Sequence, residues 1–145
     1  MTERPFLLDA SAVLAWAYDE IGGKDIGDLL SRSVITDVNL AEVISTAMRL
    51  EIRNPEQLAE DLVAAGLEVI PAQFAPVRLA ELVRLPKIHF TGDNGEPQRA
   101  ELSLGDAICI ATGEQLGEAV VITGERGWKE FHDRGDLRVV IQLFR

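Results

Sequence analysis

The stretch Pro5-Phe6-Leu7-Leu8-Asp9-Ala10-Ser11-Ala12 passes from a short apolar run directly into a pattern typical of a helix. The apolar run predicts a strand, and the segment 10–18 predicts the helix that follows it. The same succession returns along the rest of the chain. Strands rich in Val, Ile and Leu are expected at 5–9, 33–36, 67–71, 118–123 and 137–143.

Helical patterns fill the segments between these runs, at 10–18, 23–31, 37–53, 55–65, 73–86, 103–116 and 126–133. The expected strands mostly lack polar alternation, which is typical of strands buried on both faces. Strand–helix alternation along the whole chain indicates an α/β domain with a mainly parallel sheet. In such a sheet, functional sites form at the carboxyl ends of the strands.

Two further patterns relate parts of the chain to the core. The helix 37–53 carries an apolar stripe with the spacing of a core-facing side, formed by Leu40, Val43, Ile44, Ala47 and Met48. The segment 91–98 is rich in Gly, Asn and Pro, which predicts a mobile surface loop. The alternative interpretation is that this loop gates a site.

Composition is that of an ordinary globular protein, with 145 residues, 47% hydrophobic and 26% charged, so we expect a single domain over 1–145. No apolar run approaches a membrane span, and the first residues do not resemble a secretory signal. The single cysteine, Cys109, fits a reducing cytoplasmic location and disfavours a disulfide framework or a zinc site. The net charge of −10 disfavours broad, tight binding of nucleic acid but not transient cleavage of it.

Four acids, Asp9, Glu42, Asp106 and Glu125, each stand beside the end of an expected element. Asp9 closes the expected strand 5–9 and Glu125 follows the expected strand 118–123, while Glu42 and Asp106 lie in the first turns of helices. If the fold gathers them at one edge of the sheet, their mutual repulsion requires a cation. Mg²⁺ and Mn²⁺ prefer such oxygen ligands, and this kind of pocket indicates phosphodiester chemistry.

Each acid also has a purely structural interpretation. Asp9 is a suitable N-cap for the helix 10–18, and Glu42 lies opposite the apolar stripe, on a face open to solvent. Asp106 completes a capping box with Ser103. Because the helix after Asp106 starts with the apolar run 107–111, however, a carboxylate there must be paired, hydrogen-bonded or metal-bound. In the structural interpretation, Glu125 is simply an acidic residue in a loop.

Three polar neighbours are less specific. Ser11 has a hydroxyl able to bind a phosphate or a metal-bound water, and Asn39 has an amide able to orient such a water. Taken alone, Ser11 is better explained as a residue at the start of a helix, and Asn39 is also compatible with an ordinary position in the first turn of its helix. Arg126 is a candidate for pairing with Glu125 or for contact with a substrate phosphate.

In combination, the motifs resemble those of a PIN domain, and within that family the toxins of VapBC toxin–antitoxin pairs. The resemblance extends from residue 7 to residue 128. No segment is diagnostic alone, but four occur in the family's order at the expected element boundaries. They are Leu8-Asp9-Ala10-Ser11-Ala12, Asn39-Leu40-Ala41-Glu42-Val43, Leu102-Ser103-Leu104-Gly105-Asp106-Ala107 and Val121-Ile122-Thr123-Gly124-Glu125-Arg126-Gly127-Trp128.

The resemblance implies a three-layer α/β/α fold with a five-stranded, mainly parallel sheet. It also implies an endoribonuclease dependent on Mg²⁺ or Mn²⁺, which hydrolyses phosphodiester bonds of tRNA, rRNA or mRNA with a metal-activated water. By position, Asp9, Glu42 and Asp106 match the family's first three acids. Glu125 departs from the family, which more often has Asp there. The extra methylene is expected to shift a second metal or to leave it bound through water.

Roles follow from the same resemblance. Asp9 and Asp106 would hold a metal directly, with Glu42 and Glu125 acting through the metal or its waters. Thr123 matches the family's threonine beside the site, and we expect it or Ser11 to orient the attacked phosphate. The expected partners are an antitoxin whose basic or amphipathic tail covers the acidic site, and a second toxin copy in a homodimer or a hetero-oligomer.

Two rival functions compete with this interpretation. A phosphoacceptor receiver domain has the same fold class, but it needs an acid after its third strand, and the sequence there is Val69-Ile70-Pro71-Ala72-Gln73. A non-catalytic PIN-like interaction module is the second. All four acidic positions are retained, which argues against lost chemistry, although Glu125 leaves the question open.

Overall fold

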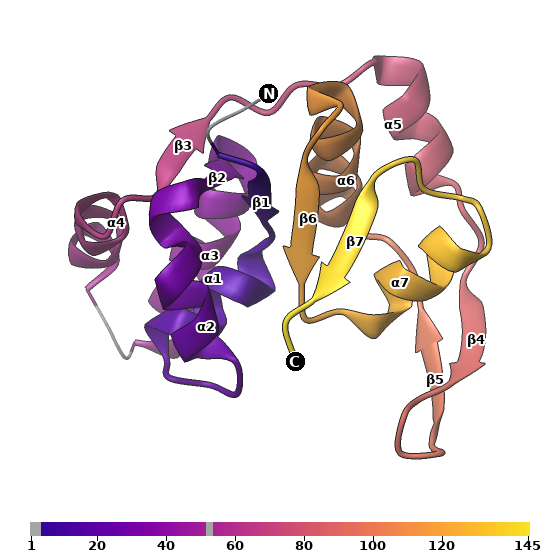
Figure 1. Ribbon diagram of the computed structural model, residues 1–145, viewed down its shortest axis with the longest axis horizontal. Helices are drawn as coiled ribbons and strands as arrows, with labels where there is room; N and C mark the ends of the chain where they lie inside the picture. The colour runs from indigo at the N-terminus through magenta and orange to yellow at the C-terminus, as the bar shows by residue number, and fades with distance from the viewer. Residues whose placement is uncertain (1–3, 52–53) are drawn as a thin grey trace.

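The computed structural model describes residues 4–51 and 54–145, and its centre is a five-stranded sheet with the order β3-β2-β1-β6-β7 (Figure 1). Every neighbouring pair in this sheet is parallel. The sheet therefore confirms the expected architecture. Its strands are β1 (Phe6–Leu8), β2 (Ser33–Thr36), β3 (Glu68–Ile70), β6 (Val120–Thr123) and β7 (Val140–Leu143).

Helices cover both faces of the sheet and complete a three-layer α/β/α arrangement, with α1 to α4 on one side and α5 to α7 on the other (Figure 1). The first group is α1 (Ala10–Ala17), α2 (Gly23–Leu29), the short 3-10 helix η1 (Leu30–Arg32), α3 (Asp37–Leu50) and α4 (Pro55–Ala64). The second group is α5 (Pro76–Val83), α6 (Leu104–Leu116) and α7 (Arg126–Asp133).

Alternate residues of the central strands divide the core into two. Leu7 of β1 packs with α5, α6 and α7, whereas its neighbour Leu8 packs with the helices on the opposite face. Val121 and Ile122 of β6 divide in the same way. Because successive side chains of a strand point to opposite faces, a strand buried on both faces must be apolar at every position. This explains the uninterrupted apolar runs.

The helix boundaries differ from expectation where the chain carries local stop and start signals. The expected helix 73–86 is shorter, since α5 begins with Pro76 at its first helical position and ends at Val83. The helix 37–53 ends at Leu50, followed by Glu51 in a left-handed conformation with φ 54°. Residues 52–53 of that prediction lie outside the described residues.

The core-facing stripe of α3 was predicted correctly at Val43 and Ala47, which are fully buried, and wrongly at Met48, which is 60% exposed. A helix turns about 100° per residue, so Met48 lies at the margin of an arc centred on Val43 and Ala47. In the last turn of α3, that margin faces solvent.

The expected loop 91–98 is instead the turn region of a β-hairpin, formed by β4 (Ile88–Thr91) and β5 (Pro97–Ala100). Gly92 donates to Glu96 O and Gly95 donates to Gly92 O, and Gly95 takes φ +80°, a conformation that favours glycine. The hairpin extends past the carboxyl ends of β6 and β7, beside α7 (Figure 1). Its strands are too short and too polar for the sequence pattern to have revealed them.

Within the described residues, no helix has both the length and the apolar character needed to cross a membrane.

Candidate active site

The acidic residues lie where the strands of the sheet end and the next helices begin. Asp9 directly follows β1 and is the N-cap of α1, while Glu125 follows β6 and precedes α7. Glu42 lies in α3, which follows β2, and Asp106 lies in the first turn of α6. The positions at element ends that the sequence indicated are therefore present.

Asp9 is the most buried of these acids, with 4% of its surface exposed. Its carboxylate accepts hydrogen bonds from the Ser11 hydroxyl (2.7 Å to Oδ1), the Ala12 N–H (2.9 Å) and the Thr123 hydroxyl (2.6 Å). Burial raises the pKa of Asp9 from its ordinary 3.8 to about 6, against the lowering effect of these hydrogen bonds, and the charge of Glu125 raises it further. Every hydrogen bond to this buried carboxylate comes from a neutral donor.

The two hydroxyls that hold Asp9 also connect it to the end of β6. Ser11 Oγ accepts the Gly124 N–H at 3.0 Å, and Thr123 Oγ1 accepts the Glu125 N–H at 3.0 Å. Since each hydroxyl has one proton, which it donates to Asp9, neither retains a donor for another ligand. This linkage fixes the Asp9 carboxylate relative to the segment that carries Glu125.

Glu42 is held against the start of α6 by a chain of buried polar groups. The Thr36 hydroxyl donates to Asn39 Oδ1 at 2.6 Å, and the Asn39 amide donates to Glu42 Oε1 at 2.6 Å and to Gly105 O at 3.1 Å. A Cβ on Gly105 would lie 2.7 Å from Glu42 Cδ, so only glycine leaves room for this carboxylate. Glu42 is thus half-buried rather than on a solvated face.

Asp106 takes part in the capping box that its sequence position predicted. It accepts the Ser103 N–H at 3.0 Å through Oδ2, and its own N–H is bonded to the Ser103 hydroxyl at 3.1 Å. Burial raises the pKa of Asp106, while the bonds with Ser103 lower it. The cap and a functional role are compatible, because Asp106 Oδ1 makes no hydrogen bond within the described chain.

Three of the acids act on one neighbour, the buried Cys109. Burial raises the pKa of the Cys109 thiol well above its ordinary range, and the charges of Asp9, Asp106 and Glu42 raise it further. Glu125 differs from the other acids because it is exposed, and in the part of the chain that the structure describes its carboxylate has no hydrogen bond or ion pair.

The donor chemistry suits a hard divalent cation, since these carboxylates are oxygen ligands in a partly buried, negatively charged region. Glu42, like Asp106, has one carboxylate oxygen without a hydrogen bond to other described residues. Across 4–51 and 54–145, however, no three His, Cys, Asp or Glu side chains lie close enough together to hold a metal ion. In this arrangement the side chains therefore do not form a coordination sphere.

Beside the acids is a pocket of about 570 Å³, here named the hairpin pocket, which extends from β5 to the start of α7. Asp106 and Glu125 line it, as do Arg99, Arg126 and Arg145. Arg126 pairs with Asp93 of the hairpin turn at 2.6 Å, and not with Glu125. The pocket thus combines acidic groups with arginines.

Two participants escaped the sequence interpretation. Thr36 was assigned only to a strand, although a Thr at the junction of a strand and a helix is a known N-cap signal. Arg99 lies on the hairpin, in a region without any recognisable motif.

Comparisons with known proteins agree with this architecture. The family model described as the PIN domain matches residues 6–133. No curated protein matches the chain. Three of the similar solved structures are VapBC complexes.

One structure is VapBC2 from Rickettsia felis bound to a DNA fragment from their promoter, with a TM-score of 0.60 and 15% identity over 95% of this chain and 97% of that chain. Another is DNA-bound VapBC from Salmonella typhimurium, with a TM-score of 0.58 and 18% identity over 97% of this chain and 98% of that chain. A third is VapBC-1 from nontypeable Haemophilus influenzae, with a TM-score of 0.57 and 19% identity over 96% of this chain and 97% of that chain. At these identities the likeness is one of fold.

Proposed function

The chain belongs to the PIN domain family, and from this premise we propose that it is a metal-dependent endoribonuclease of the VapC toxin type, a single domain that hydrolyses phosphodiester bonds of RNA. The observation that carries the proposal is Asp9. Its carboxylate is 4% exposed, has a pKa raised to about 6, and is held only by neutral donors. A buried carboxylate in this state, beside further acids, is stabilised by a bound cation.

Asp9 and Asp106 are the residues proposed to bind Mg²⁺ or Mn²⁺ directly, with Glu42 and Glu125 acting through the ion or its waters. When bound, such an ion neutralises the charge of the attacked phosphate and makes its own water a nucleophile near neutral pH. The free oxygens of Glu42 and Asp106 support this assignment. Glu125 is open to solvent and so able to turn toward an incoming ligand.

Ser11, Thr123 and Asn39 are proposed as positioning residues. The hydroxyls of Ser11 and Thr123 already donate their protons to Asp9. The amide nitrogen of Asn39 likewise makes both of its hydrogen bonds to protein groups. A phosphate-orienting role for Ser11 or Thr123 would require these bonds to break. Their contribution to catalysis is instead to hold Asp9 and Glu42 in one orientation before the substrate arrives.

An antitoxin is the proposed protein partner, and the proposed assembly is a homodimer or a toxin–antitoxin hetero-oligomer. RNA is the proposed substrate, encountered in the cytoplasm. The fold shared with three VapBC complexes supports the antitoxin. The net charge of −10 supports a partner segment that is basic.

The test is cleavage of end-labelled total RNA by the purified protein with Mg²⁺, Mn²⁺ or EDTA. We expect discrete cuts that require metal and that disappear with Asp106→Asn. Asp28→Asn is the matched control, since Asp28 is an exposed acid of α2 outside the site. Cleavage that persists in EDTA or in Asp106→Asn at the wild-type rate contradicts the proposal.

The rival function, a non-catalytic PIN-like interaction module, is favoured by the bonds that already occupy one oxygen each of Glu42 and Asp106. The two proposals differ in their response to metal. The melting temperature of a nuclease rises with the logarithm of the Mn²⁺ concentration once the site is filled, and Asp106→Asn reduces that shift. An interaction module shows neither metal-dependent cleavage nor this shift.

A further inference from the structure

The hairpin pocket contains positive charge that the proposed chemistry does not use. Arg99, Arg126 and Arg145 line it together with Asp106 and Glu125. In a chain of net charge −10, an RNA phosphate that approaches the acids is repelled unless positive groups lie nearby. The arginines are therefore placed where a substrate strand needs them.

Of the three arginines, Arg99 is the one whose side chain forms no ion pair within the described residues, although acids also line the pocket. Arg126 is paired with Asp93 at 2.6 Å, and Arg145 lies 3.8 Å from Glu20. Arg99 is exposed on β5, and no ion pair or hydrogen bond within the described residues involves its side chain. Its guanidinium is free to bind an anion, and its five donors suit a phosphate.

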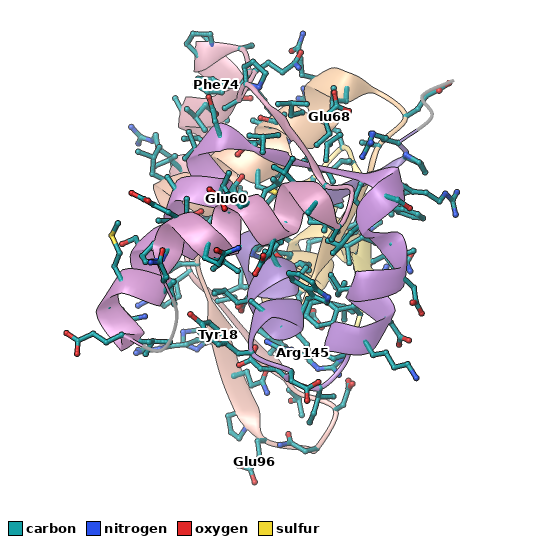
Figure 2. All side chains as sticks on the ribbon, turned by 90° about the vertical axis from the view of Figure 1, so that its left-hand side faces the viewer. Tyr18, Glu60, Glu68, Phe74, Glu96 and Arg145 are labelled. Atoms are coloured by element: carbon teal, nitrogen blue, oxygen red, sulfur yellow. The ribbon has the colours of Figure 1, made fainter. Side chains whose placement is uncertain are left out.

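Arg145 supplies a second cation, which lies beside Gly124 at the end of β6. A Cβ on Gly124 would lie 2.7 Å from Arg145 Nε, so the guanidinium lies directly on the backbone that Ser11 links to Asp9. Figure 2 shows Arg145 in the same half of the molecule as Glu96 of the hairpin turn, whereas Glu68 and Phe74 lie in the other half, and Arg145 lines the hairpin pocket together with Arg99 of β5. Arg145 and the hairpin thus belong to one region.

Apolar surface in the same pocket indicates the form of the nucleic acid. Ile21, in the connection between α1 and α2, is 82% exposed, and Phe90 of β4 is only partly buried. Unpaired bases stack on or pack against such surfaces, whereas the bases of a duplex are already stacked on one another. A pocket of about 570 Å³ also has the size of a small-ligand site.

We propose that the hairpin pocket is a binding subsite for single-stranded RNA beside the cleaved bond, in which Arg99 binds a backbone phosphate and Arg145 a second one nearer the acids. This inference rests on the proposed nuclease function for the position of the cleaved bond. It adds the residues that select and hold the strand. The hairpin β4–β5 is the element that brings Arg99 to the site.

The test measures binding of a fluorescent single-stranded RNA oligonucleotide in EDTA, where cleavage does not interfere, at several salt concentrations. Arg99→Ala is expected to weaken binding about tenfold, the loss of one charge-assisted hydrogen-bonded contact. It is also expected to reduce the slope of log affinity against log salt by about 0.7. Arg99→Glu should weaken binding further, and Arg145→Ala should act in the same direction as Arg99→Ala.

Arg84→Ala is the matched control, because Arg84 is an exposed arginine that follows α5 and lies outside the pocket. The proposal is overturned if Arg84→Ala weakens binding as much as Arg99→Ala, if Arg99→Glu binds like wild type, or if duplex RNA competes equally well with the single strand. An Arg99→Glu variant that binds RNA normally but no longer retains a copurified protein partner would also overturn it, by assigning the pocket to that partner.

Failure of this inference is distinguishable from failure of the proposed function. If wild-type protein cuts RNA with Mg²⁺ and Arg99→Glu cuts it with the same KM, the nuclease assignment stands and the subsite is wrong. If wild-type protein binds the single strand through Arg99 but never cuts it, the subsite stands and the nuclease assignment is wrong.

Discussion

The Thr123 hydroxyl lies 2.6 Å from Asp9 Oδ2 and connects the end of β6 to the end of β1. Thr123 is fully buried and also accepts the Glu125 N–H. One side chain therefore holds the most buried acid and the backbone of the most exposed one. Removal of the Thr123 hydroxyl should therefore disturb both the Asp9 carboxylate and the Glu125 backbone.

Thr123→Val keeps the shape of the side chain but removes both hydrogen bonds. We expect a loss of about 2 kcal/mol in the free energy of unfolding, because the Glu125 N–H is left without its acceptor and Asp9 without a donor. Urea denaturation measures it. Thr91→Val, at an exposed threonine of β4, is the control and should change stability by less than about 0.5 kcal/mol. Equal losses in the two variants would contradict the role given to Thr123.

The metal-free protein should become less stable as pH rises through the range set by Asp9. The unfolded residue loses its proton near its ordinary pKa of 3.8, whereas the folded residue keeps it to about pH 6. The folded state thus binds more protons between these values, and the free energy of unfolding falls by on the order of 3 kcal/mol across them, with the full loss present above about pH 6.

Asp9→Asn removes this dependence, so the variant should gain stability over wild type between pH 4.5 and pH 7.5 in EDTA. Urea denaturation of both proteins at each pH isolates the contribution of Asp9, since other titrating groups are common to both. A stability difference that stays constant over this range would mean that burial does not raise the pKa of Asp9. The same variant should lose RNA cleavage.

Gly105→Ala tests the position of Glu42 without changing any charge. The added methyl group would lie 2.7 Å from Glu42 Cδ, so the carboxylate must move away from the start of α6. Alanine is the better helix former by roughly 0.8 kcal/mol, so a large loss of stability is not expected. We expect cleavage to fall at least about tenfold while the unfolding midpoint changes little.

A double-mutant cycle supplies the control for this variant. If Gly105→Ala acts through Glu42, the variant that combines it with Glu42→Gln should be no less active than Glu42→Gln alone. Additive losses would show that the alanine acts through another contact.

The ion pair between Arg78 and Glu114 should stabilise the fold without affecting cleavage. Arg78 binds both oxygens of Glu114, at 2.7 and 3.0 Å, and also donates to Asp136 O, which ties α5 to α6 and to the segment before β7. Both side chains are largely buried, with exposures of 16% and 8%. Glu114→Ala should therefore lower stability by about 3 kcal/mol, because it leaves a buried charge without its partner.

Glu81→Ala is the matched control on the same arginine. Glu81 is exposed and lies 3.4 Å from Arg78, so its removal should cost less than about 1 kcal/mol. Thermal or urea unfolding separates the two expectations. A loss for Glu81→Ala as large as that for Glu114→Ala would contradict the importance given to burial.

Local patterns in the sequence determined most of the framework. The strand β2 and the helix α7 have the predicted boundaries, and the other strands of the sheet differ by at most three residues at an end. Asp9 and Asp106 also stand at the element ends where the sequence put them. These features were predictable because hydrophobic periodicity and capping depend on neighbours within about one or two helical turns.

Only the tertiary structure decided which groups meet. The Asn39 amide donates a hydrogen bond to Gly105 O, 66 positions away in the chain, and the Arg145 guanidinium packs against Gly124. The hairpin that carries Arg99 has strands of four residues each, too short to show a reliable period. Contacts of this kind depend on how whole layers pack, and no local pattern encodes the distance between two surfaces. The sequence by itself therefore determined the sheet, the helices and the places of the acids, whereas packing decided their hydrogen bonds and the arginines beside them.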